Sequence, residues 1–162
     1  MVLKIEDLRV LKSAEAIADG IWREVSQWDA FSKNVVGSQF VRAVDSIGAN
    51  IAESFGRYHY GEKIQFLYYA RGSVFESKYW LNRAMARELL SPELAEEYAS
   101  QLAATAYQIN AFVSTIKRNR SGEKKVSLLK EPDPVYHVDD EEPIPAIFSA
   151  EDLAWLETPE EQ

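Results

Sequence analysis

Between Leu8 and Ile116 apolar residues recur at intervals of three and four, with polar residues at the positions between them. This spacing places the apolar side chains on one face of an α-helix and the polar side chains on the other. Short polar or Gly- and Pro-containing interruptions divide the pattern into separate stretches. We therefore predict helices from about residues 6 to 28, 38 to 55, 62 to 90 and 92 to 120. Long amphipathic helices with short connections indicate an all-α protein, an antiparallel up-down four-helix bundle.

Individual residues suggest where these helices begin and end. Ser91, which a proline follows, is typical of a helix N-terminus because serine caps the first turn and proline needs no donor there. Gly56 predicts a left-handed stop after the second helix. Residues 29–38 are interpreted as a connection, in which Asn34 or Ser38 would cap the second helix.

The second predicted helix carries a polar stripe opposite its apolar face, made of Arg42, Ser46, Asn50, Glu53 and Arg57. The stripe could bind a ligand, or it could form a polar network with a facing Ser73 or Glu76, between helices or between subunits. We favour the network, because buried polar groups must be paired somewhere. Glu53 lies four residues before Arg57, the favourable order for a helical ion pair, and both are predicted to be assembly residues.

Small and aromatic residues suggest where the helices make contacts. Small residues let another backbone approach closely, so close helix contacts are predicted at Gly48, Ala49, Gly72 and Ser73. Large aromatic side chains at helical spacing are predicted to be core or interface anchors rather than a ligand pocket. These are Trp22, Trp28, Tyr79, Trp80 and Phe112.

The composition narrows the chemistry. Cysteine is absent, which excludes disulfides, zinc–thiolate sites and thiol catalysis. His59 falls in a predicted turn and His137 in the C-terminal tail, so the Glu-x-x-His pairs of di-metal carboxylate bundles are missing. We predict no enzymatic activity, metal or cofactor. No apolar run approaches the roughly 18 residues that span a bilayer, and the charged N-terminus does not resemble a secretory signal. A cytoplasmic location without membrane contact is expected.

The charge is unevenly distributed along the 162 residues, whose net charge is −8. Residues 1–120 contain 15 Lys and Arg against 14 Asp and Glu, whereas residues 121–162 contain 3 against 12. The second region also holds all of the prolines except Pro92. We therefore divide the chain into a nearly neutral bundle, residues 1–120, and an acidic, mostly extended tail, residues 121–162.

One segment of the tail differs from the rest. Ser149 can cap a helix, Asp152 lies three residues further on as in a capping box, and Phe148 can pack on Leu153. A helix near residues 149–157 would be too short to be stable alone. The segment is interpreted either as an unstructured end or as a docking peptide for its own bundle or a neighbouring subunit. Its docking residues would be Phe148, Leu153, Trp155 and Leu156.

Basic residues raise the alternative of nucleic-acid binding. The candidate contacts are Arg83, Arg87, Lys117, Arg118, Arg120, Lys124 and Lys125, with tyrosines such as Tyr58 and Tyr69 available for stacking. Two observations oppose this interpretation. The net charge of residues 1–120 is only +1, and the acidic tail would compete for any basic patch.

Between about Leu8 and Arg120 the chain contains the motifs Gln39–Ala43, Ser46-Ile47, Asn50–Glu53, Gly56-Arg57, Phe66-Leu67, Ala70, Gly72-Ser73 and Glu76. The most specific of them is Asn-Ile-Ala-Glu followed by Gly-Arg. These motifs resemble a family of bacterial four-helix-bundle proteins. The family includes proteins encoded within intervening sequences of large-subunit ribosomal RNA genes and the accessory protein of diversity-generating retroelements.

The resemblance implies an up-down bundle that assembles as a ring-shaped homopentamer. In the retroelement members the ring is basic and serves as a platform for a reverse transcriptase and nucleic acid, and most members have no assigned activity. Two positions depart from the family pattern, which usually has glycine where Ser54 stands and often proline where Gly48 stands. The acidic tail lies outside the resemblance.

These observations predict a non-enzymatic, oligomeric scaffold or assembly protein. It would present a surface to a protein or nucleoprotein partner. The alternative is a stand-alone nucleic-acid-binding ring of the retroelement accessory type.

Overall fold

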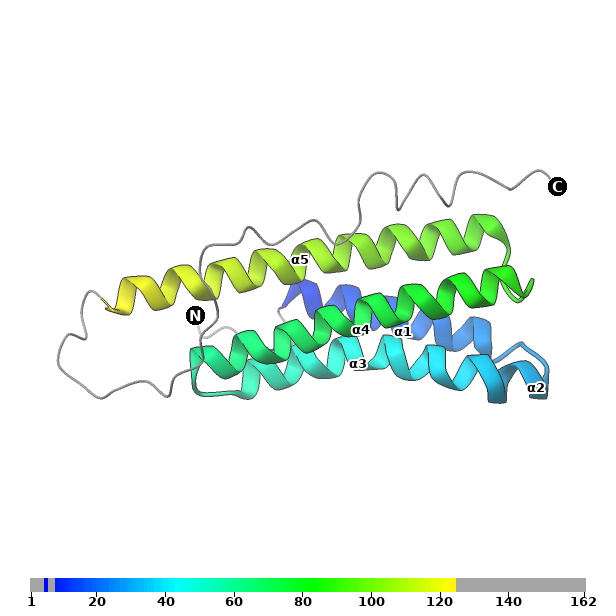
Figure 1. Ribbon diagram of the computed structural model, residues 1–162, viewed down its shortest axis with the longest axis horizontal. Helices are drawn as coiled ribbons and strands as arrows, with labels where there is room; N and C mark the ends of the chain where they lie inside the picture. Colours follow the sequence, from blue (N-terminus) through cyan, green and yellow to red (C-terminus); the bar gives the residue numbers. More distant parts are fainter. Residues whose placement is uncertain (1–4, 6–7, 125–162) are drawn as a thin grey trace.

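The computed structural model describes residue 5 and residues 8–124, and every regular element within them is helical. The elements are α1 (Arg9–Val25), α2 (Ala30–Ser32), the π-helical turn η2 (Lys33–Gly37), α3 (Ser38–Gly56), α4 (Tyr60–Ala86) and α5 (Pro92–Lys124). The four long helices lie side by side, and α5 runs antiparallel to α4 (Figure 1). The prediction of an all-α four-helix bundle is confirmed. None of the described helices has an apolar stretch long enough to cross a membrane.

Each long helix packs against two others. α1 contacts α3 and α5, α3 contacts α4, and α4 contacts α5. The order around the bundle is therefore α1, α3, α4, α5, which places the seam between α1 and α3 opposite the seam between α4 and α5. This order determines which outer faces lie on opposite sides of the molecule.

Large apolar side chains from all four long helices fill the centre of the bundle. The largest fully buried residues are Phe40, Ile17, Ile21, Ile47, Ile51, Leu67, Leu81, Leu102, Ile109, Val44, Val74 and Val113. They recur at intervals of three, four or seven along their helices, as the amphipathic pattern predicts. Burial of each such side chain contributes about 1.5–3 kcal/mol, and together they hold the four helices in one core.

The predicted connection at residues 29–38 is wrong, because the chain there is helical from Ala30 onward. Asp29 caps this helix instead of Asn34 or Ser38, since its carboxylate accepts hydrogen bonds from the backbone N–H groups of Phe31 (2.9 Å) and Ser32 (3.1 Å). Gly37 lies inside the π-helical turn η2, close to α1. A Cβ at Gly37 would lie 2.5 Å from a methyl group of Val25, so this glycine permits close packing rather than a turn.

Other helix ends differ from the expectation in informative ways. The predicted left-handed stop at Gly56 is wrong: no described glycine has a positive φ, and the chain leaves α3 through Arg57 in extended conformation (φ −76°, ψ 143°). The left-handed residue is Glu88 (φ 56°), just after α4. The predicted cap at Ser91 is confirmed, because its hydroxyl oxygen accepts from the backbone N–H of Leu94 at 3.2 Å. α5 continues to Lys124, beyond its predicted end at residue 120.

The predicted close contacts at small residues hold only in part. Ser73 is buried against α3, but a Cβ at Gly72 would meet nothing within 4 Å. Gly48 faces Leu11 and Ala14 of α1 at ordinary van der Waals distance, and Ala49 is exposed. Gly72 therefore lies on the outer face of the bundle, where no other part of the described chain comes within 4 Å of a Cβ at this position.

Candidate interaction surfaces

Part of the predicted polar stripe lies in the seam between α3 and α4. The side-chain amide of Asn50 donates to the backbone carbonyl of Ser46 at 2.8 Å and to the hydroxyl of Ser73 at 3.5 Å. The Ser73 hydroxyl in turn donates to the carbonyl of Tyr69 at 3.1 Å. These bonds link two helices of one chain, so this network needs no second subunit to satisfy its groups.

The remaining members of the stripe are placed differently. Arg57 forms an ion pair with Glu53, and its guanidinium lies 4.5 Å from the centroid of the Phe66 ring on α4. Arg57 therefore joins the end of α3 to the start of α4. Arg42 and Glu76 are both exposed, on α3 and α4, outside the Asn50 network.

The outer side of α4 exposes aromatic rings. Tyr69 is 50% exposed, Phe75 46% and Tyr79 55%. Two tyrosines on this helix carry a stacked arginine: Arg71 lies 5.3 Å from the ring centroid of Tyr68, and Arg83 lies 5.9 Å from that of Tyr79. Tyr68 and Tyr79 are separated by close to three helical turns, so both pairs lie on the same side of α4.

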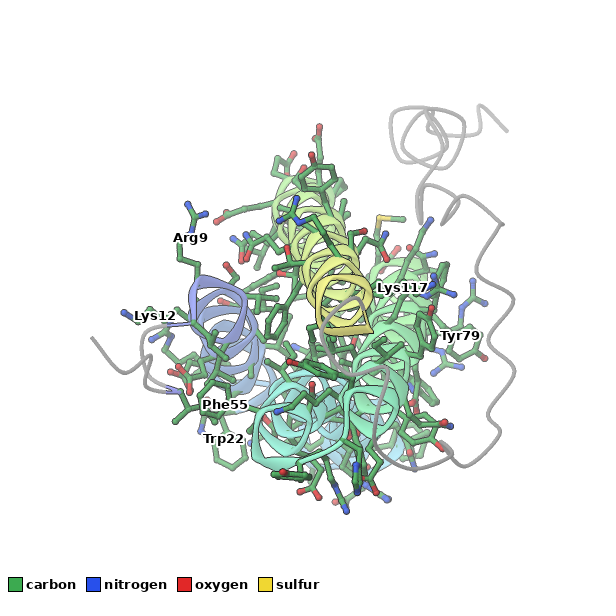
Figure 2. The ribbon with its side chains drawn as sticks, turned by 90° about the vertical axis from the view of Figure 1, so that its left-hand side faces the viewer. Arg9, Lys12, Trp22, Phe55, Tyr79 and Lys117 are labelled. Atoms are coloured by element: carbon green, nitrogen blue, oxygen red, sulfur yellow. The ribbon has the colours of Figure 1, made fainter. Side chains whose placement is uncertain are left out.

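This aromatic surface is also basic. Residues 64–87 of the α4 region and 98–118 of α5 contain a single acid, Glu76, among six cations, a net charge of +5. Five further exposed acids lie just outside these two segments, so the excess of positive charge is confined to the segments themselves, and residues 60–118 together have a net charge of +1. These acids are Glu62, Glu88, Glu93, Glu96 and Glu97. The cations are Arg71, Lys78, Arg83, Arg87, Lys117 and Arg118. We call the outer surface of these two segments the α4/α5 face. Figure 2 shows Lys117 and Tyr79 on this side of the bundle, with Arg9 and Lys12 on the opposite side.

The cations predicted to contact nucleic acid fall into separate groups. Arg83 and Arg87 lie where α4 ends, whereas Lys117 and Arg118 lie beside its beginning, because α5 runs antiparallel to α4 (Figure 1). The separation is about 35 Å at 1.5 Å per residue. Arg120 and Lys124 lie on α5 with side chains that are not described, and Lys125 is outside the described residues, as are the predicted docking residues Phe148, Leu153, Trp155 and Leu156.

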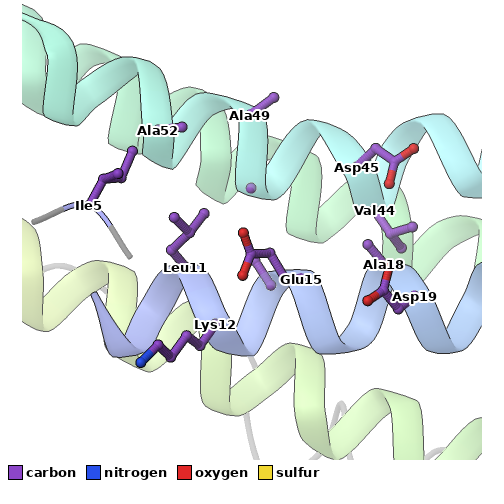
Figure 3. A pocket seen from close by; sticks show the side chains of 12 residues that line it. Ile5, Leu11, Lys12, Glu15, Ala18, Asp19, Val44, Asp45, Ala49 and Ala52 are labelled. Carbon is purple, nitrogen blue, oxygen red and sulfur yellow. The ribbon is translucent and has the colours of Figure 1, made fainter. Parts of the chain in front are cut away.

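A groove follows the seam between α1 and α3 (Figure 3). Its floor consists of small and aliphatic residues, namely Leu11, Ala14, Ala18, Val44, Gly48, Ala49 and Ala52. Glu15, Asp19 and Asp45 lie along it with one cation, Lys12, so the lining has a net charge of −2. Figure 3 shows Glu15 between the two helices and the other two acids near one end. We call this feature the α1/α3 groove.

Two carboxylates in the α1/α3 groove, those of Asp19 and Asp45, repel each other. Partial burial, together with the neighbouring carboxylate of Asp19, raises the pKa of Asp45 above its usual value of 3.8. A cationic neighbour would stabilise the charged form of the Asp45 carboxylate. Sequence reasoning missed the groove, because its acids lie on two different helices and no local pattern pairs Asp19 with Asp45.

The predicted aromatic anchors divide into two groups. Trp28, Trp80 and Phe112 are partly buried against the core. Trp22, 63% exposed, and Tyr79 are not core residues of this chain, so for them the interface interpretation remains. Trp22 lies four residues after Ala18 and thus continues the side of α1 that lines the α1/α3 groove.

The described residues offer no group of three or more His, Asp or Glu side chains arranged to hold a metal ion. What they offer are surfaces: a polar seam whose groups are hydrogen-bonded within the chain, the basic α4/α5 face and the acidic α1/α3 groove.

A family model for the 23S rRNA-intervening sequence protein matches residues 6–111. The chain belongs to this family. The match to the 23S rRNA-intervening sequence protein family spans α1 to α4 and much of α5, and excludes the acidic tail.

A solved structure supports the fold. The chain is similar to a protein of unknown function from the S23 ribosomal protein family of Bacteroides thetaiotaomicron, with 23% sequence identity and a TM-score of 0.58. The similarity covers 97% of that chain and 64% of this one. A comparison with curated proteins gave no match. Membership of the 23S rRNA-intervening sequence protein family therefore brings a fold but no assigned activity.

Proposed function

We propose that this protein is a non-enzymatic assembly protein in which the α4/α5 face of one copy packs into the α1/α3 groove of the next. The observation that carries the proposal is the complementarity of these surfaces. One has exposed tyrosines and a net charge of +5, and the other is an acidic groove beside the exposed Trp22. The proposal includes a cytoplasmic location and a scaffold role toward a protein or nucleoprotein partner.

The position of the two surfaces determines what kind of assembly would form. They lie on opposite sides of the bundle, because the helices follow the order α1, α3, α4, α5. A contact between two different surfaces of the same chain is heterologous, and it generates a closed ring or an open filament depending on the rotation between copies. The homopentameric ring implied by the family resemblance is a closed assembly of this type, and we adopt it as the proposed subunit number.

The chemistry of both surfaces suits a protein contact. Tyrosine, tryptophan and arginine are the residue types that contribute most to interfaces, and Tyr79, Trp22 and Arg83 are available for this role. Opposite charges on the two surfaces would orient the copies and disfavour contacts between like surfaces. An added copy would also bring cations to Asp45, whose charged form is disfavoured in the isolated chain.

The test uses two full-length variants, each with one damaged surface, and light scattering after gel filtration. Tyr79→Glu damages the α4/α5 face, and Asp45→Lys damages the α1/α3 groove. Each variant alone is expected to be monomeric, because every contact needs both surfaces. An equimolar mixture is expected to give dimers and nothing larger, because one intact face and one intact groove remain per pair.

Tyr58→Glu is the matched control, since Tyr58 is 89% exposed but lies in the turn before α4. This variant should keep the subunit count of the parent. Trp155→Ser removes a predicted docking residue of the tail, so it shows whether the tail hides a surface of the bundle. If the parent chain and the Trp155→Ser chain are both monomeric at every concentration, the proposal is contradicted. A mixture of the two damaged variants that remains monomeric would contradict the heterologous contact.

The two tyrosine–arginine pairs of α4 favour a second candidate function, a stand-alone nucleic-acid-binding ring. Tyrosine rings can stack on bases, while arginines neutralise phosphates and make binding dependent on salt. Under this alternative, the parent chain shifts a single-stranded RNA in a gel, and Arg83→Glu weakens the shift and its salt dependence. If neither the parent chain nor the Trp155→Ser chain shifts the RNA in the gel, nucleic-acid binding is excluded.

A further inference from the structure

We propose that residues 147–156 of the acidic tail dock on the α4/α5 face of their own chain and compete there with the next copy. The competition rests on the proposed assembly function, whereas the docking itself does not. The proposed occupant of the α4/α5 face is thus a segment of the same chain, and this segment lies outside the described residues. Three properties argue for this choice: charge, apolar content and reach.

Charge selects the α4/α5 face over the α1/α3 groove. The segment contains Glu151 and Asp152 without any cation, and it follows the run of four acids at residues 139–142. The two segments that form the α4/α5 face, residues 64–87 and 98–118, have a net charge of +5, whereas the lining of the groove has a net charge of −2. Opposite charges attract the segment to the first surface, and like charges keep it away from the second.

The apolar residues of the segment match the exposed aromatic rings. Leu153, Trp155 and Leu156 are large apolar side chains in a region otherwise dominated by acids and prolines. The α4/α5 face presents Tyr69 and Tyr79 at the surface, with open space at Gly72 between them. A tryptophan ring placed at this gap would contact aromatic rings and the stacked arginines together.

The segment can reach this surface. α5 ends at Lys124, beyond the end of the bundle at which α4 begins (Figure 1). Residues 125–146 can span up to about 70 Å, and α4 is about 40 Å long. Every part of the α4/α5 face is therefore within range. Because the segment is tethered, its effective concentration at the face exceeds that of a second copy in dilute solution.

The first test measures assembly of the full chain and of Trp155→Ser by light scattering over a dilution series. Removal of the competing aromatic is expected to lower the concentration for half-assembly by about tenfold or more. Tyr136→Ser is the matched control, because it removes a tail aromatic outside the segment, and it should leave this concentration unchanged. An unchanged value for Trp155→Ser overturns the proposal. A raised value also overturns it, because it would place the segment in the contact between copies.

The second test is independent of assembly. A fluorescent peptide of residues 145–160 is titrated with the Trp155→Ser chain, and its anisotropy is measured. We expect binding that is weakened about fivefold or more by Tyr79→Ser or Arg83→Glu and is unchanged by Glu15→Gln in the α1/α3 groove. Absence of binding, or an affinity that changes with Glu15→Gln and not with Tyr79→Ser or Arg83→Glu, overturns the docking. Peptide binding by a chain that never assembles would uphold the docking and contradict only the proposed function.

Discussion

The hydroxyl group of Tyr98 on α5 lies so close to Gly20 on α1 that a Cβ at position 20 would be 2.7 Å from it. The ring carbon Cε1 of Tyr98 would be 3.0 Å away. Tyr98 is buried, so its ring has little freedom to move aside. Gly20 therefore allows α1 and α5 to pack closely, and its place inside a helix has a structural reason.

This contact predicts that Gly20→Ala destabilises the protein, although alanine is the better helix former. The helix propensity gained is about 1 kcal/mol, whereas forcing an extra methyl group into a packed contact costs about 1–3 kcal/mol. We expect a net loss of about 1 kcal/mol in the free energy of unfolding, measured by urea denaturation. Gly72→Ala, measured in the Trp155→Ser background so that the tail segment leaves the gap at Gly72 open, is the control. It should gain about 0.5–1 kcal/mol, because no described atom lies within 4 Å of its new Cβ.

A second substitution tests the cause of that loss. In the Tyr98→Ala background the obstructing ring is absent, so adding Gly20→Ala should increase stability as it does at Gly72. If Gly20→Ala is stabilising in the parent chain, the contact with Tyr98 does not constrain the packing of α1 against α5.

The buried hydroxyl of Ser54 predicts a specific loss at the turn between α3 and α4. It donates to the carbonyl of Lys63 at 2.9 Å, and the Lys63 ammonium donates back to the carbonyl of Phe55 at 3.2 Å. Ser54→Ala removes the first bond and should cost about 1 kcal/mol of unfolding free energy. Ser114→Ala is the control, because its exposed hydroxyl bonds only within α5. Equal effects at both positions would show that the bond between helices contributes nothing specific.

The pairing of Arg57 with the Phe66 ring predicts that lysine cannot replace this arginine fully. Arg57→Lys keeps the positive charge near Glu53 but loses the planar group that lies over the ring. A loss of about 0.5–1 kcal/mol is expected. In a double-mutant cycle, this loss should disappear in the Phe66→Leu background. Additive effects of the two substitutions would indicate that the stacked geometry does not stabilise the turn.

The sequence predicted the four long helices and their core because one residue spacing encodes both. Ile17, Ile47 and Val74 each belong to an apolar series that points inward whatever the exact helix ends. Local signals at the helix ends were less reliable. The sequence predicts Gly37 as part of a connection, but it lies inside a helical turn where it accommodates Val25, a neighbour that is distant in sequence.

The candidate surfaces depended on pairings between helices that no local pattern contains. The motif residues Asn50 and Ser73 were expected to share a network, and the structure brings them together. The sequence does not pair the carboxylates of Asp19 and Asp45, because they become neighbours only when α1 packs against α3. The net charge of +1 for residues 1–120 is similarly uninformative, because it sums the basic segments of α4 and α5, the acidic groove and the other charged residues of the bundle.

The raised pKa of Asp45 predicts a substitution with opposite effects on stability and assembly. Burial and Asp19 raise this pKa, so the folded chain binds the Asp45 proton more tightly than the unfolded chain does. The contribution of this group to stability therefore decreases as the pH rises through the interval above 3.8. At pH 7 the full cost of the charge is present, and Asp45→Asn should raise stability, by up to about 0.5 kcal/mol as is usual for a surface site. Below both pKa values the gain should vanish.

The same variant should assemble less well at pH 7, because the α1/α3 groove then loses a negative charge that faces the basic surface of the next copy. Urea denaturation at pH 7 and at about pH 3, at concentrations where the chain is monomeric, measures the change in stability. Light scattering at pH 7 measures the change in assembly. In the Asp19→Asn background the gain in stability should be smaller, since one cause of the raised pKa is gone. A gain that persists at about pH 3 would show that it does not arise from the charge, and unchanged assembly would mean that Asp45 takes no part in the contact between copies.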